Sequence, residues 1–222
     1  MTKEKEMFDE LTKLTVPDQF GTDYDDGDSW SISQIINQLP SQVQVLFGAS
    51  QLVCIFPEEK EWVAKLPFSG CFEGDDFNEF SYNYCELTVE IYQKAVDAGV
   101  EQFFAEMKKV GFTEDCTPFY YQERVKETYA HSSNEEHTAS DGSKKIIKKK
   151  RASDESSWHC LPEVWLCAAI DFYGLEAVEE LLNFCEENHL FQDLHCENFG
   201  YRFDNSPVLF DYCGFYDNSC DW

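Results

Sequence analysis

Basic residues are scarce in this chain of 222 residues: 17 Lys and Arg stand against 43 Asp and Glu, so the formal net charge at pH 7 is −26. Such a charge repels nucleic-acid phosphates and anionic membrane surfaces over long range, so direct binding to either is not expected. No apolar run in the sequence approaches the ~18 residues that a transmembrane helix needs.

Zinc-type spacings of cysteine and histidine are also missing, and no C-x-x-C occurs among the 10 cysteines. The first residues, Met-Thr-Lys-Glu-Lys-Glu-Met, have no apolar stretch behind their charges, so a secretory signal is not expected. Cys54, Cys85, Cys167 and Cys185 lie within apolar or helical patterns. We therefore expect reduced, mostly buried thiols in a cytoplasmic protein.

Apolar residues are plentiful, because hydrophobic types make up 43% of the chain, enough to bury a core. A period of two predicts strands at 43–47, 52–56, 61–68 and 118–125, and a hairpin with strands either side of a turn at 204–207. Helices are predicted at 1–14, from 29 to before Pro40, at 79–98 up to Gly99, and on both sides of Gly174 within 162–190. The fold class predicted is α+β.

Four regions follow from these patterns. Residues 126–157 change composition sharply and carry seven of the 17 basic residues, six of them between Lys144 and Arg151. We interpret this region as a flexible insertion rich in Ser and Lys. The regions are an N-terminal helical and loop extension at 1–42, a sheet-rich part at 43–125, the insertion at 126–157, and a mainly helical part at 158–222.

Three oxygen-bearing side chains near the C-terminal end could converge on one point of a predicted hairpin. Asp193 is followed by Asn198, which precedes the first hairpin strand, and by Asp211, which ends the second. Their oxygen atoms suit a magnesium ion that carries phosphates. The alternative is an acidic hairpin in which Asp and Asn only form turns.

The run Phe-Gln-Asp-Leu-His-Cys-Glu-Asn and the later Asp-Tyr-Cys-Gly resemble the catalytic loop and metal-binding motif of the protein-kinase-like fold. The Asp-Leu-His-x-x-Asn form is most similar to aminoglycoside and choline phosphotransferases. The resemblance implies two lobes, a β-sheet N-lobe with a helix and a truncated, mainly helical C-lobe. It implies that Asp193 orients the attacking hydroxyl and accepts its proton, while Asn198 and Asp211 hold Mg²⁺.

Val-Ala-Lys at 63–65 resembles the Val-Ala-Ile-Lys strand of the same family, with one residue fewer. The resemblance implies that Lys65 binds the α- and β-phosphates of ATP. It also implies a helix glutamate that pairs with this lysine, for which Glu86 and Glu90 are the candidates; Glu86 flanks the apolar face more closely. A lysine on an edge strand and a solvated acidic helix face are the alternatives.

The remaining ATP contacts are also implied by the resemblance, which covers about residues 43–125 and 158–215. A tight turn, Gly48-Ala49-Ser50, stands where the family has a glycine-rich loop, and its backbone N–H groups would face the phosphates. A segment similar to the hinge between the lobes would bring backbone groups to the adenine edge. Its residues are Gln122, Glu123 and Arg124.

Several departures from the family are visible. Phe191 and Gln192 stand in place of His and Arg, and Asp-Tyr-Cys-Gly has one residue more than Asp-Phe-Gly. Only Gly48 remains of the glycine-rich pattern. The sequence continues for eight residues after Gly214, where a protein kinase would have an activation segment and peptide-binding helices.

The resemblance implies a phosphotransferase that uses ATP and Mg²⁺ to phosphorylate a hydroxyl on a protein or a small molecule. Two alternatives stay open. One is a pseudokinase-like binding module that acts by contact, which the short glycine turn favours. The other is an acidic protein that imitates DNA and inhibits a DNA-binding partner, which the charge of −26 favours. A kinase-like chain trimmed in this way resembles proteins of phages and mobile elements. If it is encoded by a phage, the expected location is the host cytoplasm.

Overall fold

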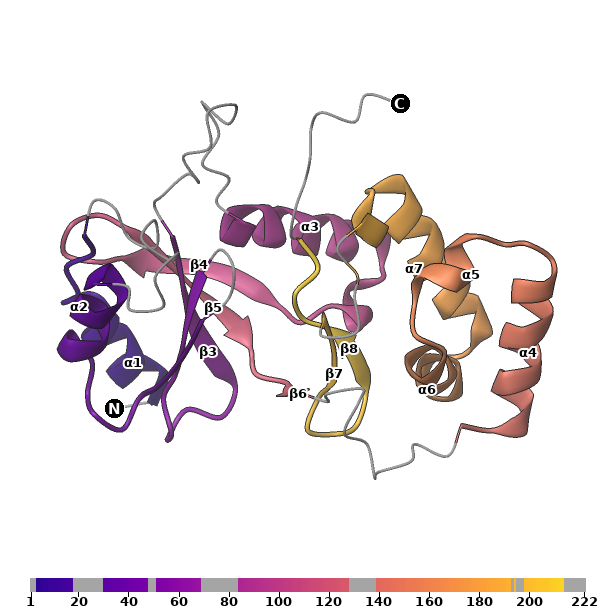
Figure 1. Cartoon of the computed structure of the whole chain (residues 1–222), viewed down its shortest axis with the longest axis horizontal. Helices are drawn as coiled ribbons and strands as arrows, with labels where there is room; N and C mark the ends of the chain where they lie inside the picture. Colours follow the sequence, from indigo (N-terminus) through magenta and orange to yellow (C-terminus); the bar gives the residue numbers. More distant parts are fainter. Residues whose placement is uncertain are drawn as a thin grey trace. The chain divides into compact units, whose positions relative to one another are not determined.

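The computed structural model describes residues 3–17, 30–47, 51–68, 84–127, 139–192, 194 and 198–213. Within these residues the chain is mixed α+β, with a five-stranded antiparallel sheet, a three-stranded sheet and seven α-helices (Figure 1). It divides into two compact units. Unit 1 is Met1–Val89 with Glu106–Arg124, and unit 2 is Glu90–Ala105 with Val125–Trp222.

Unit 1 is built on the five-stranded sheet, whose spatial order is β1-β2-β3-β5-β4. The bounds are β1 Gln44–Phe47, β2 Gln51–Ile55, β3 Trp62–Pro67, β4 Met107–Phe112 and β5 Pro118–Glu123. The four strands predicted in this part of the chain are therefore confirmed. The sequence pattern did not predict β4, because Lys108, Lys109 and a bulge before Gly111 interrupt its apolar alternation.

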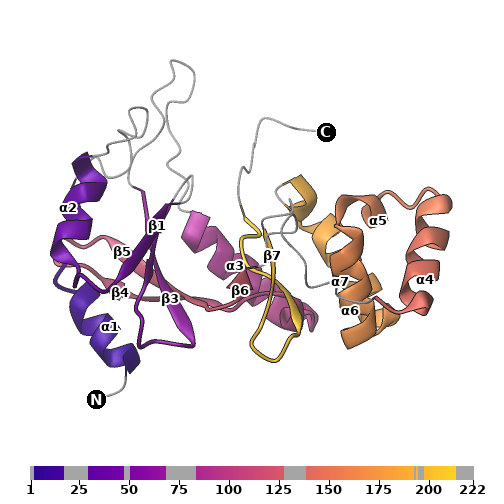
Figure 2. The ribbon, with the colours of Figure 1, turned by 60° about the horizontal axis from the view of Figure 1, so that its bottom comes forward.

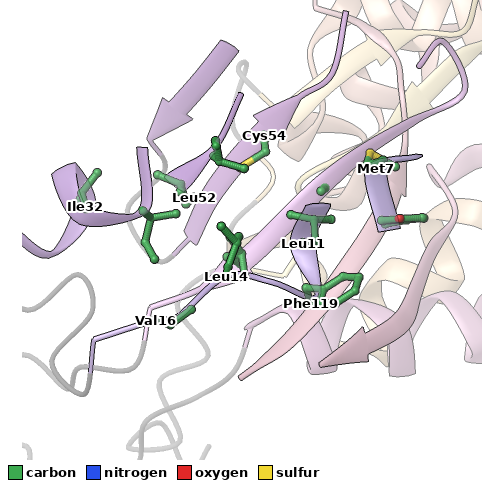
Figure 3. Close-up of a cluster of buried hydrophobic side chains, with 13 residues drawn as sticks. Met7, Leu11, Leu14, Val16, Ile32, Leu52, Cys54 and Phe119 are labelled. Atoms are coloured by element: carbon green, nitrogen blue, oxygen red, sulfur yellow. The ribbon is translucent and has the colours of Figure 1, made fainter. Parts of the chain in front are cut away.

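One face of this sheet is covered by α1 (Lys3–Leu11) and α2 (Trp30–Gln38), which lie beside the strands in Figure 2. Figure 3 shows Met7, Leu11 and Leu14 next to Leu52 and Phe119 of the sheet. Met7 and Leu11 are fully buried. The helices expected within residues 1–42 are present, but they do not form a separate extension, because Met7, Leu11, Ile32 and Ile35 belong to the core of unit 1.

The opposite face is covered by the first turns of α3 (Tyr84–Ala98). Cys85 and Val89 of this helix pack on Met107 and Tyr120 of the sheet. The helix ends at Gly99, as predicted: Gly99 has φ +74°, a left-handed conformation that glycine adopts without a steric penalty. Residues 79–83 of the predicted helix lie outside the described part of the chain.

Unit 2 contains a group of helices and a small sheet. The helices are α4 Asp141–Ala152, α5 Ser157–Cys160, α6 Glu163–Tyr173 and α7 Leu175–Glu187, with short 3₁₀ turns η2 Glu101–Phe103 and η3 Leu190–Gln192. The predicted helix pair is confirmed, and Gly174 at φ +92° separates its two members. Val178, Leu181, Leu182 and Cys185 of α7 are fully or nearly fully buried, whereas Leu175 at its start is half-buried.

The three-stranded sheet of unit 2 has the order β6-β7-β8, with β6 at Lys126–Glu127, β7 at Phe199–Tyr201 and β8 at Pro207–Leu209. The predicted hairpin and its turn at 204–207 are confirmed. Asp204 Oδ1 accepts hydrogen bonds from the backbone N–H of Ser206 (2.9 Å) and from its hydroxyl (2.7 Å), which closes the turn. A Cβ at Gly200 would lie 2.9 Å from the carbonyl oxygen of Lys126, so β6 and β7 require glycine there.

The basic part of the expected insertion is a packed helix. In α4, Ile147 is fully buried and the helix packs against α6. The Arg151 guanidinium donates to the carbonyl oxygens of Trp158 (2.9 Å) and Leu161 (2.9 Å). Lys150 Nζ lies 2.6 Å from a carboxylate oxygen of Glu179. The expectation of a flexible insertion is therefore wrong for residues 141–152.

The thiols in the described residues follow the sequence-based expectation. Cys54, Cys85, Cys167 and Cys185 are buried thiols that form no disulfide bond. Burial disfavours the thiolate and raises the pKa of Cys54 to about 12, which makes this thiol chemically inert at neutral pH. Each helix within the described ranges is too short or too polar to cross a membrane.

The packing of α4 predicts a clear difference between two neighbouring positions. Ile147→Ala removes buried apolar atoms and should lower the free energy of unfolding of unit 2 by about 2–5 kcal/mol. Lys148→Ala, at an exposed position of the same helix, should change it by less than about 0.5 kcal/mol. Urea unfolding checks both.

Limited trypsin digestion of the native protein should spare the bonds after Lys144 to Arg151, and early cleavage there would contradict the packing.

Candidate functional site

Lys65 lies on β3 and points to the face of the sheet that α3 covers. Its neighbours Ala64 and Leu66 are both fully buried in the core under α1 and α2, so the alternation of the strand directs Lys65 to the opposite side. Its side chain is nearly buried, at 4% exposure. Lys65 is therefore not a lysine on a solvated edge strand, because β3 is paired on both sides.

Glu86, on the first turn of α3, has two donors from the sheet. Its Oε2 atom accepts a hydrogen bond from the Tyr120 hydroxyl at 2.5 Å and one from Lys109 Nζ at 3.0 Å. The Tyr120 hydrogen bond is the main reason that the pKa of Glu86 lies below its usual value; burial opposes this shift, and the Lys109 ammonium adds to it. Glu86 is therefore held as a carboxylate at neutral pH.

Glu90 is in a different environment from Glu86. It lies one turn further along α3 and is exposed. Glu86 and Lys65 both belong to unit 1, whereas Glu90 is the first residue of unit 2. Its contacts to the sheet thus make Glu86 the better candidate than Glu90 for the partner of Lys65.

The expected adenine-binding segment has a hydrogen-bond pattern that does not suit that role. Gln122 and Glu123 belong to β5, and the N–H of Glu123 donates to the carbonyl oxygen of Glu106 at 2.8 Å. The N–H of Arg124 donates to the carbonyl oxygen of Glu61 at 2.7 Å. Backbone groups of Gln122 to Arg124 were expected at the adenine edge; the N–H groups of Glu123 and Arg124 are not free for that role, because they complete the sheet.

Asn198 and Asp211 lie at the same end of the β7–β8 hairpin. Asn198 directly precedes β7, Asp211 follows β8 by two residues, and the N–H of Phe210 donates to the carbonyl oxygen of Asn198 at 3.1 Å. Asn198 is 3% exposed, whereas Asp211 is partly exposed. The hairpin thus brings two oxygen-bearing side chains that are thirteen positions apart in the sequence to one end of a short ladder.

Buried and partly buried polar contacts hold this hairpin inside unit 2. The Arg202 guanidinium donates to the carbonyl oxygens of Gln102 at 2.7 Å and Phe104 at 2.8 Å. The Tyr173 hydroxyl lies 3.0 Å from the carbonyl oxygens of both Gln102 and Pro207. The hydroxyl of Tyr212, next to Asp211, donates to the carbonyl oxygen of Ala105 at 3.1 Å. These contacts position both strands and the residues after β8.

Four of the residues proposed from the sequence, Asp193 and the turn Gly48-Ala49-Ser50, lie outside the described residues. Among the described His, Cys, Asp and Glu side chains, no group of three or more could hold a metal ion. Asn198 and Asp211 remain the metal ligands to consider, because an amide oxygen can also bind a metal ion. Their amide and carboxylate oxygens have the chemistry that Mg²⁺ prefers.

Tyr120 and Lys109 were not identified from the sequence as site residues. The signal available was the alternation of 118–125, which places Tyr120 on the opposite face from Phe119 and Tyr121. Lys109 could not be found that way, because β4 itself was not recognised.

Comparison of the chain with protein-family models, with curated proteins and with solved structures gave no match.

The contacts of Glu86 predict a pH-dependent contribution to stability. Because its pKa is lowered in the folded state, the contribution is complete above the ordinary value of about 4.3 and is lost as the pH falls through the native value. Lys109→Met removes part of this contribution, so the variant should have a lower free energy of unfolding than the wild type at neutral pH. The difference between the two proteins should vanish in acid, where Glu86 is protonated in both. Chemical denaturation across the pH range measures this difference. In a Glu86→Gln background, Lys109→Met should give no pH-dependent difference.

A second prediction concerns Arg202. Arg202→Met keeps much of the side-chain length but leaves two carbonyl oxygens without their charged donor, so it should destabilise unit 2 by about 2–3 kcal/mol in urea unfolding. Lys126→Met is the control, because Lys126 Nζ makes exposed contacts to the same hairpin at Phe203 and Asn205. Equal losses in the two variants would show that the buried position of the guanidinium is unimportant.

Proposed function

We propose that the chain is a compact phosphotransferase of the protein-kinase-like type, which transfers a phosphoryl group from ATP to a hydroxyl with the help of Mg²⁺. The observation that supports this most is the arrangement in unit 1. In kinases the phosphate-binding lysine stands on the third strand of the sheet and its glutamate on a helix. Here Lys65 stands on the third strand, β3, and Glu86 on the next helix, α3, which covers the face to which Lys65 points.

The second support comes from the order of parts in unit 2. The catalytic-loop asparagine of a kinase is followed by the aspartate that binds Mg²⁺. Asn198 and Asp211 follow that order and border a hairpin, at the end where the run containing Asp193 enters it. This arrangement weighs against a simple turn-forming role for Asn198 and Asp211, because the turn of the hairpin is formed by Asp204 and Ser206.

In this proposal each protein group has a distinct task. Lys65 binds the phosphate oxygens and favours the negative charge that builds up on them during transfer. Asp193 orients the acceptor hydroxyl and takes its proton. Asn198 and Asp211 would hold Mg²⁺, which neutralises charge on the phosphates when bound. Phosphoryl transfer depends mainly on positioning and charge, so this small set of residues is sufficient in principle.

The charge of the chain restricts the acceptor. A net charge of −26 repels polyanions, so an acceptor hydroxyl on a neutral or cationic molecule approaches more easily than one on a nucleic acid. The four exposed lysines of α4 are the main local exception among the described residues. They are Lys144, Lys145, Lys148 and Lys149.

The proposal predicts different defects for different residues. Asp193→Asn should lower ATP turnover or phosphoryl transfer by ~10²–10⁴-fold while nucleotide affinity changes little, because this residue acts on the acceptor. Asp211→Asn should remove most Mg²⁺-dependent nucleotide binding. Lys65→Met should weaken both nucleotide binding and turnover. Labelled-ATP turnover and calorimetry with Mg²⁺ and a non-hydrolysable ATP analogue measure the two quantities.

Lys94→Met is the matched control for Lys65→Met, since Lys94 is an exposed lysine on α3. It should leave binding and turnover unchanged. A contact-acting binding module gives another pattern: no turnover in the wild type, and full biological activity in Asp193→Asn. That outcome would reject the enzymatic proposal.

A further inference from the structure

A row of side chains crosses the α3-covered face of the sheet at the level of Lys65. In the antiparallel register Val53 of β2 opposes Lys65, Lys65 opposes Tyr120 of β5, and Tyr120 opposes Lys109 of β4. Directly opposed residues of antiparallel strands project from the same face, with Cβ atoms about 4.5–5.5 Å apart. Tyr120 therefore stands between the two lysines of the row.

Tyr120 and Lys109 of this row both donate hydrogen bonds to the carboxylate of Glu86. Tyr120 is fully buried, and its hydroxyl donates to Glu86 Oε2 at 2.5 Å; Lys109 Nζ reaches the same oxygen atom at 3.0 Å. Two donors from neighbouring strands thus converge on one atom of an α3 side chain. The location of that carboxylate is set by the sheet that carries Lys65 as well as by the helix.

We infer that Tyr120, assisted by Lys109, is a positioning residue that fixes the Glu86 carboxylate relative to Lys65 and thereby orients Lys65 toward the phosphates. This inference rests on the proposed function for the role of Lys65. It adds to that function a device within unit 1 alone, since all four residues belong to that unit.

Tyr120 is the more important of the two donors. Its hydroxyl is carried by a fully buried ring packed between Cys85 and Met107, so the hydrogen bond is short and its donor cannot move away. The Lys109–Glu86 pair is about two-fifths exposed on each side, at 39% and 41%, and exposed ion pairs contribute little. Loss of the hydroxyl should therefore change the site more than loss of the ammonium.

The test uses Tyr120→Phe, which keeps the buried ring and removes only the donor. Its control is Tyr121→Phe, the next residue of β5, whose ring is also fully buried but faces α1, and whose hydroxyl reaches the carbonyl oxygen of Glu4 at 3.4 Å. Tyr120→Phe should lower kcat for ATP turnover about tenfold with a much smaller change in KM, the pattern expected when a group acts mainly in the transition state. Lys109→Met should lower kcat only about twofold, in line with a small exposed-pair energy. Tyr121→Phe should leave both constants unchanged.

The pH profile separates positioning from loss of structure. Tyr120 of β5 and Lys109 of β4 are titratable groups in contact with Glu86, and Glu90 lies one turn further along α3. Because the Tyr120 hydroxyl favours the Glu86 carboxylate, its removal should move the acidic limb of kcat/KM to higher pH in Tyr120→Phe and not in Tyr121→Phe. Equal acidic limbs in both variants would overturn the inference.

A measurement without nucleotide keeps this inference separate from the proposed function. In NMR titrations of the full chain, Tyr120→Phe should raise the pKa of the Glu86 carboxyl and shift the ¹⁵N resonance of the Lys65 ammonium, whereas Tyr121→Phe should change neither. If the wild type turns over no ATP but these shifts occur, the proposed function fails and the coupling stands. An unchanged Lys65 resonance in Tyr120→Phe rejects the coupling, whatever the turnover.

Discussion

The pairing of β3 with β5 at the centre of the five-stranded sheet is the constraint on which the candidate site in unit 1 depends. Each strand alternates between two buried faces: Ala64 and Leu66, like Phe119 and Tyr121, belong to the core under α1 and α2. The residue between each pair, Lys65 or Tyr120, must then point to the α3 side. A shift of the register by one residue would exchange the two sets and place a lysine in an apolar core. The energy of burying the α1 and α2 core therefore also fixes the direction of Lys65.

In unit 2 the corresponding constraint is the need to satisfy buried carbonyl groups. The segment that follows α3 contains three carbonyl oxygens that accept hydrogen bonds, those of Gln102, Phe104 and Ala105. Arg202 in the hairpin and Tyr212 just after it supply the donors. Leaving these carbonyl groups without a hydrogen-bond donor would cost free energy of folding. The hairpin is therefore held in the position that satisfies them. The residues at its end, Asn198 and Asp211, are placed by these contacts and not by any attraction between themselves.

The strongly acidic composition also has a structural role within this unit. Lys150 and Arg151 hold α4 to acidic partners on three other segments, Glu155, Glu163 and Glu179. Two of the six basic residues between Lys144 and Arg151 are therefore turned inward, and the other four, all lysines, remain exposed. Because Asp and Glu are in excess, basic residues of α4 that face the rest of unit 2 have carboxylates nearby with which to form ion pairs.

Local patterns in the sequence were sufficient for the strands β1, β2, β3 and β5, for the helix pair around Gly174, for the end of α3 at Gly99 and for the β7–β8 hairpin. Each of these depends on periodicity or on a turn residue within a few positions. Lys65, Asn198 and Asp211 became candidates because their runs resemble motifs of the kinase-like fold, and the strand and hairpin that carry them were recognisable from the sequence. Tertiary structure decided what depends on partners far away in the chain. It packed the N-terminal helices into the core of unit 1, packed α4 through ion pairs with acidic residues of other segments, and used the N–H groups of Glu123 and Arg124 to complete the sheet. It also brought Tyr120 and Lys109 to Glu86, since hydrogen bonds between residues more than twenty positions apart leave no periodic trace in a single sequence.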